Sequence, residues 1–482
     1  MRTGEIINKN VKDLRQIMIV ISLGTFMSAL DGSIVNISLP SISSYFNITL
    51  TTVEWVVLSY LIIISSLLLT FGRLGDLYGH KKIYIIGFAI FTIGSLLCAL
   101  SSSIIFLVIS RALQAVGAGM LMAMGPAIIT LNAPANQRGR FLGIIGISVS
   151  VALSVGPVLG GFLTSAFGWQ SIFLINIPIG IMAFIWAIKV LPAKEKCEKQ
   201  TFDFAGAIIL FFALIGIIFP LSFIDKLGIK NPLIIGIFTA GIILLVLFVF
   251  IELKIKHPMF DISLFKSKVF LMGNISLLLN FIAQFTVILI LPFYLIEFRN
   301  FPASTAGLIL IASPAIALMI TPLAGYLTDR YDTRYLSSSG MFIIATGLFL
   351  LSLLNEKSSI INIVLYLAII GLGVGMFQTP NNCAIMNSVP KNRSGTASSM
   401  LATMRNLGMV FGASLSGSLF SYREIYLTKL FVLEDLSAAE LNILVFKGAM
   451  RFTFFIGALL AGSAVIISLI RGSSKRDSEN TL

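Results

Sequence analysis

Two charged residues lie inside long apolar stretches of this 482-residue sequence, where charge is costly. Asp31 belongs to LDGSIVNISLP, and Arg111 belongs to RALQAVGAGM. An ionisable side chain in apolar surroundings is expensive enough that function is its default explanation. A carboxyl group can take up and release a proton, whereas a guanidinium group stays protonated. The two residue types are therefore suited to proton transfer beside a fixed positive charge.

Helix geometry predicts that Asp31 and Arg111 lie at similar depth. A rise of about 1.5 Å per residue puts Asp31 roughly 20 Å from the start of an apolar helix at 17–39, and Arg111 about 10 Å from the start of one at 104–131. If these helices run in opposite directions across about 30 Å of hydrocarbon, the residues can form an ion pair, directly or through water. We expect movements that separate them to switch Asp31 between proton-loaded and proton-free states; the alternative is a purely structural hydrogen bond.

Four more polar residues are candidates to line a central cavity. Asn36 follows Asp31 by five residues, and it either bonds a neighbouring helix, which is slightly favoured, or contacts substrate. Glu54 falls at the outer end of the second apolar stretch, where it can reach water. Arg405 lies at mid-depth with no acidic residue at that depth in the second half, so it reaches Asp31, meets carbonyls and water, or binds a polar or anionic substrate group. Gln284 completes the set.

Composition predicts an all-α polytopic membrane protein. Apolar residues make up 57% of the chain and charged residues 11%, a balance that a water-soluble domain of this size does not have. Apolar runs of about 20 residues recur, and no short alternating strands are visible. We predict about fourteen transmembrane helices. They span 17–39, 53–71, 83–100, 104–131, 140–163, 171–190, 204–224, 232–251, 269–296, 305–327, 337–354, 360–386, 396–420 and 449–470.

The basic residues predict orientation. The net charge is +13, and most of the 34 Lys and Arg residues fall in the termini and even-numbered connectors, whereas connectors 40–52 and 164–170 carry none. By the positive-inside rule, both termini are cytoplasmic, so nucleic acid is not needed to explain the charge. The N-terminus lacks the features of a cleaved secretory signal. The long external connector 421–448 forms either a helical hairpin on the membrane surface or a solvated loop with one packed turn.

An internal repeat divides the chain. GRLGDLYGHKK at 72–82 recurs as GYLTDRYDTRY at 325–335, which aligns Asp76 with Asp329 at an offset of 253 residues. Two six-helix bundles with two inserted central helices follow, an arrangement that places a substrate site between halves that rock. The predicted parts are a cytoplasmic segment at 1–16, a bundle at 17–190, linkers with the two extra helices at 191–268, a bundle at 269–470 and a cytoplasmic tail at 471–482.

Two further motifs join and pack helices. The repeated loop has glycine-permitted tight turns and charged residues at the cytoplasmic surface, where the lysine can act as a topology signal alone. The residues of interest in the loop and its repeat are Gly72, Arg73, Asp76, Gly79, Lys81, Asp329 and Arg330. The motif GPVLGG places Gly156, Pro157, Gly160 and Gly161 on one helix, where small residues let helix backbones approach closely.

Together these motifs resemble the major facilitator superfamily, and specifically its fourteen-span drug:proton antiporter branch. LDGSIVNISLP is similar to that branch's first-span signature, GRLGDLYGHKK to the loop between spans two and three, RALQAVGAGM to the span-four motif and GPVLGG to the span-five antiporter motif. The resemblance implies that the loop residues named above serve conformational gating, with Asp76 in a latch, that GPVLGG controls leak and that Arg405 lies beside the cavity. The second half departs from the pattern, because Leu367 stands near the position equivalent to Arg111.

The expected function is export of small amphipathic compounds such as drugs, dyes and biocides in exchange for protons. The alternatives are export of one specific metabolite or lipid-like molecule and, remotely, a membrane sensor or enzyme, although GxxxxGK[ST] and HExxH are absent. We expect a monomer in the cytoplasmic membrane of a bacterium, driven by the proton motive force without a cofactor. Cys98, Cys197 and Cys383 indicate neither a disulfide nor a metal site.

Overall fold

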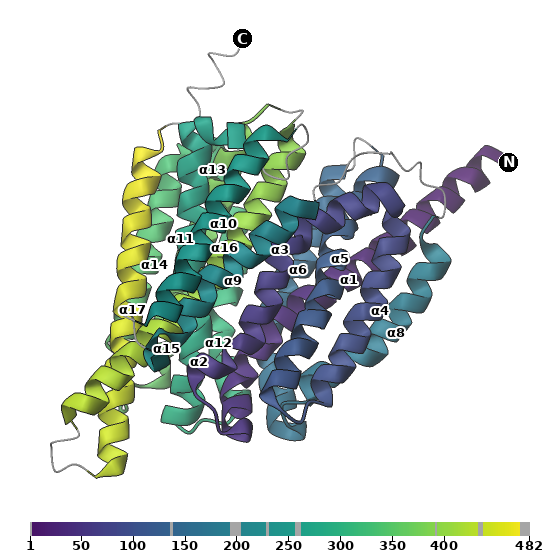
Figure 1. Ribbon diagram of the computed structural model, residues 1–482. Coiled ribbons are helices and arrows are strands. Elements are labelled where there is room, and N and C mark those ends of the chain that lie inside the picture. The colour runs from purple at the N-terminus through teal and green to yellow at the C-terminus, as the bar shows by residue number, and fades with distance from the viewer. Residues whose placement is uncertain are drawn as a thin grey trace.

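The computed structural model describes residues 2–134, 138–192, 204–227, 231–255, 262–390, 393–431 and 437–472. Within these ranges the chain is helical and contains no strand, as composition predicts. Figure 1 shows long helices that run side by side. α1 begins and α17 ends at the upper end of that view, and we call the opposite end, where α1 ends and α12 begins, the far end.

The helices fall into three groups along the sequence. The first half comprises α1 (Arg2–Phe46), α2 (Leu50–Val53), α3 (Trp55–Tyr78), α4 (His80–Ala99), α5 (Ile104–Asn132), α6 (Arg138–Phe167), α7 (Ser171–Leu174) and α8 (Asn176–Val190). A middle pair consists of α9 (Phe204–Leu227) and α10 (Pro232–Lys254). The second half comprises the 3-10 helix η1 (Ile262–Lys266), α11 (Lys268–Phe293), the π-helix η2 (Tyr294–Phe298), α12 (Ala303–Leu310), α13 (Ala312–Arg330), α14 (Thr333–Ser352), α15 (Ile360–Asn387), α16 (Ser394–Phe431) and α17 (Ala438–Ile470).

Twelve helical stretches among the described residues are long and apolar enough to cross a membrane. The predicted spans 204–224 and 396–420 coincide with α9 and α16, which are not among those twelve. The structure thus shows a multi-pass helical membrane protein with about twelve apolar spans, and the count of fourteen stays a prediction.

The motif at 72–82 is mostly helix and not loop, which corrects the sequence interpretation. α3 continues through Gly72 and Gly75 to Tyr78, and α4 starts at His80. The break is at Gly79, whose φ of +92° is a conformation that side chains other than hydrogen rarely allow. Helical hydrogen bonding continues through the polar residues on both sides of Gly79. Only one tight turn therefore separates the two helices.

The described part of the connector 421–448 is helical, which agrees with the hairpin alternative and not with the solvated loop. α16 continues to Phe431 and α17 begins at Ala438, so most of this segment extends two long helices; residues 432–436 lie outside the described ranges. Ser437 caps α17 in a reciprocal capping box with Glu440, which explains where that helix starts. At the other end of the chain, α1 begins at Arg2, so residues 2–16 of the predicted polar segment are helical as well.

The two halves of the chain touch at the far end through α6 and α12. A Cβ atom on Gly161 would lie 2.2 Å from the carbonyl oxygen of Ala303, and one on Gly307 would lie 2.2 Å from that of Pro157. The backbone N–H of Ser304 donates to Ser165 Oγ at 3.0 Å. Such contacts need bare backbone on both helices, and glycine provides it.

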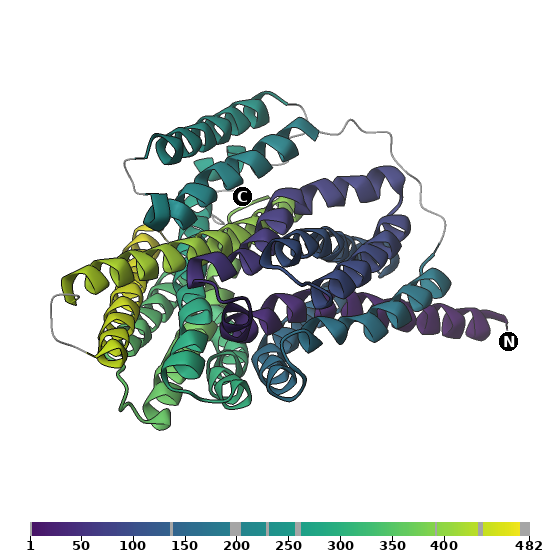
Figure 2. The ribbon, with the colours of Figure 1, turned by 60° about the horizontal axis from the view of Figure 1, so that its bottom comes forward.

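The middle pair lies along one side of the molecule, as Figure 2 shows. α10 packs on α9, with Gly216 and Gly241 in close backbone contact, and α9 packs on both α3 and α16. At the far end, Ser418 Oγ of α16 donates to the carbonyl oxygen of Leu221 at 2.6 Å. α9 thus contacts a helix from each half.

We predict that Gly161→Leu parts the two halves at the far end, because its side chain cannot share space with the Ala303 carbonyl. Spin labels at Phe167 and Asn300, in a cysteine-free background, should report a longer distance by pulsed electron resonance. Gly143→Leu is the matched control, since a Cβ atom there meets nothing within 4 Å on the same helix. Equal distances in both variants would contradict this account of the far-end contact.

Candidate functional site

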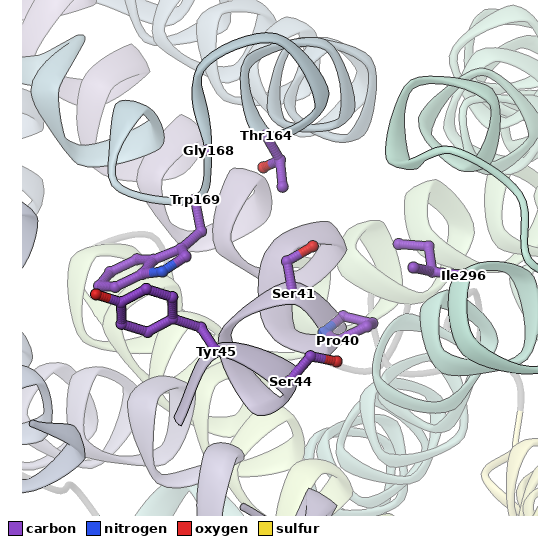
Figure 3. A pocket seen from close by; sticks show the side chains of 8 residues that line it. All are labelled: Pro40, Ser41, Ser44, Tyr45, Thr164, Gly168, Trp169 and Ile296. Atoms are coloured by element: carbon purple, nitrogen blue, oxygen red, sulfur yellow. The ribbon is translucent and has the colours of Figure 1, made fainter. Parts of the chain in front are cut away.

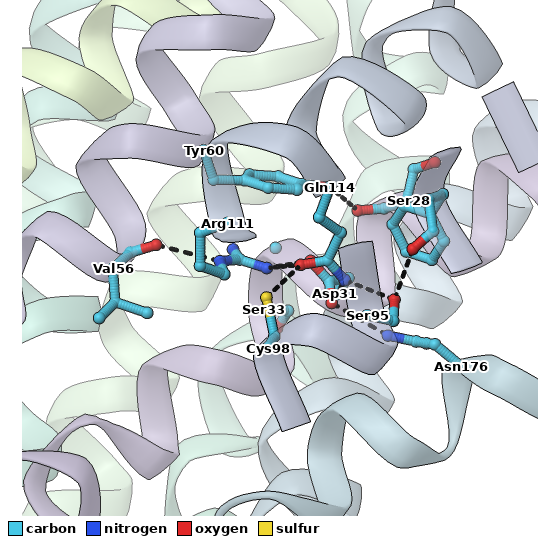
Figure 4. A network of polar contacts seen from close by, with 12 residues as sticks. Ser28, Asp31, Ser33, Val56, Tyr60, Ser95, Cys98, Arg111, Gln114 and Asn176 are labelled. Carbon is cyan, nitrogen blue, oxygen red and sulfur yellow. Dashed lines mark hydrogen bonds and ion pairs between the residues drawn. The ribbon is translucent and has the colours of Figure 1, made fainter. Parts of the chain in front are cut away.

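Asp31 and Arg111 form an ion pair inside the first half of the molecule. Asp31 on α1 is 0% exposed and Arg111 on α5 is 1% exposed. One guanidinium nitrogen, Nη1 of Arg111, lies 2.5 Å from Oδ2 of Asp31. Figure 4 shows the two side chains pointing toward each other from separate helices. The depth estimate from helix geometry therefore placed both residues correctly.

The second carboxylate oxygen of Asp31 is held by two amides that sequence reasoning missed. Gln114 Nε2 donates to Oδ1 at 2.8 Å, and Asn176 Nδ2 donates to the same atom at 3.0 Å. Gln114 lies one turn beyond Arg111 on α5, so helical spacing could have indicated it. Asn176 begins α8, and nothing in its local sequence places it beside Asp31.

Arg111 is fixed by contacts on several sides. Its Nε donates to the carbonyl oxygen of Val56 at 3.0 Å, and Nη1 also donates to Gln114 Oε1 at 2.6 Å. The guanidinium carbon Cζ lies 4.2 Å from the centre of the Tyr60 ring, a cation–π contact. The Tyr60 hydroxyl donates to the Ser28 carbonyl at 2.9 Å, which holds the ring in place.

α4 orients the Gln114 amide from the other side. Gln114 Nε2 donates to Ser95 Oγ at 2.8 Å, and Cys98 Sγ lies 3.6 Å from Gln114 Oε1. This approach depends on Gly94, where a Cβ atom would lie 2.6 Å from the Cα atom of Gln114. In this one orientation, the Gln114 amide accepts from Arg111 through Oε1 and donates to Asp31 through Nε2.

Both carboxylate oxygens of Asp31 accept hydrogen bonds from buried donors. Three donors, from Arg111, Gln114 and Asn176, contact its two oxygens, and all three are buried. Without such partners, a buried carboxylate would destabilise the folded protein. Removing one partner of a buried ion pair costs about 3–5 kcal/mol. These contacts join α5 and α8 to the carboxylate carried by α1.

Asn36 and Glu54 occupy different settings from those expected of cavity residues. Asn36 Nδ2 donates to the Gly32 carbonyl on its own helix at 2.9 Å, and not to a neighbouring helix as the structural alternative predicted. Glu54 is 0% exposed, so the expectation that it reaches water is wrong. It is covered because Gly417 of α16 packs directly against its carboxylate group. Two acids besides Asp31 are therefore buried: Glu54, and Glu252 of α10, which is 2% exposed.

Arg405 and Gln284 lie on helices of the second half of the chain. Arg405 is on α16 and Gln284 on α11, and both are partly buried. Arg405 Nε and Gln284 Nε2 have no hydrogen-bond partner among the described residues. Among the described residues, Asp31 accepts hydrogen bonds from the side chains of Arg111, Gln114 and Asn176. Arg405 is not one of these donors, so the alternative in which it reaches Asp31 is not seen.

The gating candidates are only partly covered by the structure. Arg73 and Asp76 belong to α3, and their side chains lie outside what the structure describes. Lys81 Nζ donates to the carbonyl oxygens of Ile188 and Leu191 at 2.9 and 2.6 Å, which caps the end of α8. Asp329 and Arg330 end α13 on the exposed surface. Their part in gating stays a prediction.

The GPVLGG motif packs α6 against two helices. Cβ atoms on Gly156 and Gly160 would lie 2.4 Å from Ser33 Oγ and 2.6 Å from Ile37 Cγ2 of α1, and Gly161 meets α12. Pro157 contributes the carbonyl that contacts Gly307. The predicted close approach of helix backbones is present, and one helix face of this motif adjoins the helix that carries Asp31.

One buried arginine falls where the sequence predicted only a tail. Arg471 follows α17, is 1% exposed and donates to Asn381 Oδ1 at 2.7 Å and to Thr333 Oγ1 at 3.1 Å. Burial lowers the pKa of its guanidinium to about 10. These bonds tie the end of α17 to α14 and α15.

No group of three His, Cys, Asp or Glu suited to a metal occurs among the described residues. Cys98 and Cys383 are free thiols there, and Cys197 lies outside the described residues.

This chain belongs to the major facilitator superfamily. The family model matches residues 21–413. The chain is 38% identical over 411 residues to a riboflavin transporter, RibZ, of Clostridioides difficile (strain 630), covering 85% of this chain and 89% of that protein. It is 28% identical over 419 residues to a multidrug transporter protein, MdtP, of Bacillus subtilis (strain 168), covering 86% and 77%. The fold and family are those of transporters and not of enzymes.

Solved structures show the same fold at low sequence identity. A bacterial homolog of the human lysosomal transporter Spinster, in an inward-facing and unoccupied conformation, matches with a TM-score of 0.70 and 15% identity over 95% of this chain and 97% of that one. A D-xylose–proton symporter matches with a TM-score of 0.62 and 14% identity over 92% and 96%. The class is therefore a multi-pass transporter of small molecules with bacterial relatives, which implies an inner membrane.

We predict that Arg111→Met lowers the free energy of unfolding by about 3–5 kcal/mol, because it leaves the Asp31 carboxylate buried without its ionic partner. Adding Asp31→Leu should recover most of that loss, since no charge then remains to be solvated. Steric-trapping measurements in bicelles would report both values. Arg330→Met, at an exposed cation, serves as the control. Additive losses in the double variant would show that the two residues do not stabilise each other.

Proposed function

We propose that this protein is a proton-coupled antiporter that moves small amphipathic compounds out of the cell by alternating access. The observation that carries the proposal is the buried carboxylate of Asp31 held by donors from α5 and α8. Arg111 acts as the fixed positive charge, and Asp31 is the group that takes up and releases the proton. The proton motive force supplies the energy, and no cofactor is required.

Coupling follows from what a proton does to this network. Protonated Asp31 no longer attracts Arg111 as an anion, so the α1–α5 contact weakens and the helices can shift. A shift of this kind changes how α1 meets α6 through Gly156 and Gly160, and α6 in turn carries the contact with α12. The proton site and the far-end closure are thereby linked through a single helix, α6.

We infer fourteen spans with both termini in the cytoplasm. α9 has 24 residues and α16 has 38, so each is longer than the roughly 30 Å hydrocarbon core at about 1.5 Å per residue. The basic connectors support this orientation by the positive-inside rule. The halves then meet at the outer side, which makes the described conformation inward-facing. Two six-helix bundles, with α9 and α10 inserted between them, are the domains of this proposal.

The substrate class has two candidates. Export of drugs, dyes and biocides is supported by one relative named as a multidrug resistance protein, at 29% identity, and one named as a multidrug transporter protein, at 28% identity. Transport of one specific metabolite is supported by the 38% identical relative named as a riboflavin transporter. Arg405 and Gln284 provide donors for polar acceptors on either kind of substrate. The remaining partners are protons and lipid, for a monomer in a bacterial cytoplasmic membrane.

Asp31→Asn should abolish uphill transport and retain downhill exchange, because the amide keeps the size of the carboxyl group and cannot carry a proton. Proteoliposomes with an imposed pH gradient would measure flux of ethidium and of riboflavin. Glu356→Gln, at an exposed carboxylate on the opposite half, should transport at the wild-type rate. Uphill flux at the wild-type rate in Asp31→Asn would defeat proton coupling through this residue.

The same assay separates the two substrate classes. Uphill flux of several unrelated dyes would favour the multidrug alternative, and uphill flux of riboflavin with none of the dyes would favour the specific-metabolite alternative. Cells that carry the chain should resist several unrelated toxicants only in the first case. Flux of neither compound class under a pH gradient would count against both.

A further inference from the structure

Asn176 reaches the Asp31 carboxylate from the start of α8, on the side away from Arg111. Its amide nitrogen Nδ2 lies 3.0 Å from Oδ1 of Asp31, and the residue is 1% exposed. In Figure 4, Asn176 and Arg111 lie on opposite sides of Asp31. Because Asn176 is neutral, it stabilises the ionised carboxylate by donating a hydrogen bond and adds no charge of its own. Its contribution therefore depends on whether the donor stays within reach.

The start of α8 is held against α1 by the turn that precedes it. Gly168 has a φ of +83°, which allows the chain to reverse after α6. Trp169 then packs on Tyr45 and Phe46 of α1, with ring centres 5.6 and 5.7 Å away. Figure 3 shows the indole of Trp169 beside the Tyr45 ring, where both line a hollow at the far end. Asn176 follows seven residues later, so this contact places the start of α8 along α1.

The other end of α8 is held by α4. Lys81, in the first turn of α4, donates through Nζ to the carbonyl oxygens of Ile188 and Leu191 at 2.9 and 2.6 Å. Between the two ends, Gly180 lies so close to Thr92 of α4 that a Cβ atom on the glycine would overlap with Thr92 Oγ1. α8 therefore rests on α4 along its length.

Lys81 and Asn176 thus act at opposite ends of one helix. Ile188 is twelve residues beyond Asn176, about 18 Å along α8. α8 is an α-helix of 15 residues, so releasing its last turn lets its first turn tilt away from α1. Lys81 also stands two residues after Gly79, where α3 ends and α4 begins. A change at this turn can therefore alter the contact at Asp31.

We infer that Asn176 is a positioning residue for proton binding at Asp31, and that Lys81 acts on Asp31 through Asn176 by holding α8 against α4. The effect on transport rests on the proposed function, because only there does Asp31 carry the coupled proton. The effect on proton binding rests on the contacts alone. Loss of the Asn176 donor favours the protonated carboxyl group, since a hydrogen bond to the charged form is removed. Gln114 still donates to Oδ1, so the carboxylate is not left bare.

Other ionisable groups face Asp31 and have to stay constant in any test. Among the described residues these are Arg111 of α5, Tyr60 of α3 and Cys98 of α4. The remaining charged residues of α3, α5, α6, α8 and α11 lie toward the ends of those helices. Substitution of Asn176 leaves all three facing groups in place, so a change in proton binding is then due to the lost amide.

Infrared spectroscopy of the full chain in nanodiscs, recorded as a function of pH, tests the role of Asn176. The C=O band that Asp31→Asn removes reports the protonated carboxyl group of Asp31. Asn176→Leu keeps the approximate size and loses the donor, so half-protonation should move upward by about one pH unit. Asn176→Ser, whose hydroxyl is too short to reach Asp31, should move it the same way, and it replaces the leucine variant if size-exclusion profiles show that variant unfolded. Asn132→Leu is the matched control, because Asn132 donates to the Ile128 carbonyl of its own helix.

A double-variant cycle tests the role of Lys81. Lys81→Met should move half-protonation upward in the wild-type background and cause no further movement in Asn176→Leu, because its effect passes through the lost donor. Lys82→Met removes the same charge from an exposed neighbour and should leave the titration unchanged. Equal shifts from Lys81→Met in both backgrounds would mean that its charge acts directly, and no shift in either would mean that it does not act. Both results would overturn the route through Asn176.

Transport is measured separately, as uphill flux of ethidium and riboflavin in proteoliposomes. The pH of half-maximal flux should move upward in Asn176→Leu by the same interval as the titration. Wild-type uphill flux in Asp31→Asn would defeat the transport proposal, while the infrared titration would still decide the role of Asn176. An unchanged titration in the folded Asn176 variants, or no protonation of Asp31 at any pH at which the wild type stays folded, would overturn that role.

Discussion

The desolvation of one carboxylate is the constraint on which the first half of the molecule depends. Asp31 is taken out of water completely, and only the donors of Arg111, Gln114 and Asn176 offset that cost. Because these donors come from α5 and α8, the network fixes the positions of three helices at once. Tyr60 on α3 and Ser95 on α4 then orient the arginine and the amide, so five helices converge on a single charge.

Close backbone contacts connect this buried charge with the seam between the halves. α6 uses Gly156 and Gly160 against α1, and it uses Gly161 against α12. Side chains would hold these helices further apart, so glycine is what allows backbone to lie against backbone on both faces of α6. α9 adds a second element that touches both halves, through α3 and α16.

The second half is not a copy of the first in chemical terms. By the repeat offset of 253 residues, Gln284 of α11 falls at the position of Asp31, and the region equivalent to Arg111 contains Leu367. A neutral amide cannot change charge, so this position of the second half cannot repeat the part that we propose for Asp31. Arg405 and Gln284 leave donors without partners among the described residues, in contrast with the fully bonded network around Asp31. Backbone architecture is repeated, but the polar chemistry has diverged.

Sequence alone determined the solvent of this protein, the approximate positions of its apolar helices and the pair of residues at its charged centre. Those features follow from local rules, because apolar run length reports membrane spans and helical rise reports depth, which is how Asp31 and Arg111 could be matched. Only the tertiary structure decided that Asn176 completes the site, that Glu54 is covered by Gly417 and that Trp169 lines a hollow. Each of these depends on which helix faces lie against each other, and helix packing is settled by side-chain contacts between residues far apart in the chain, which no local pattern records.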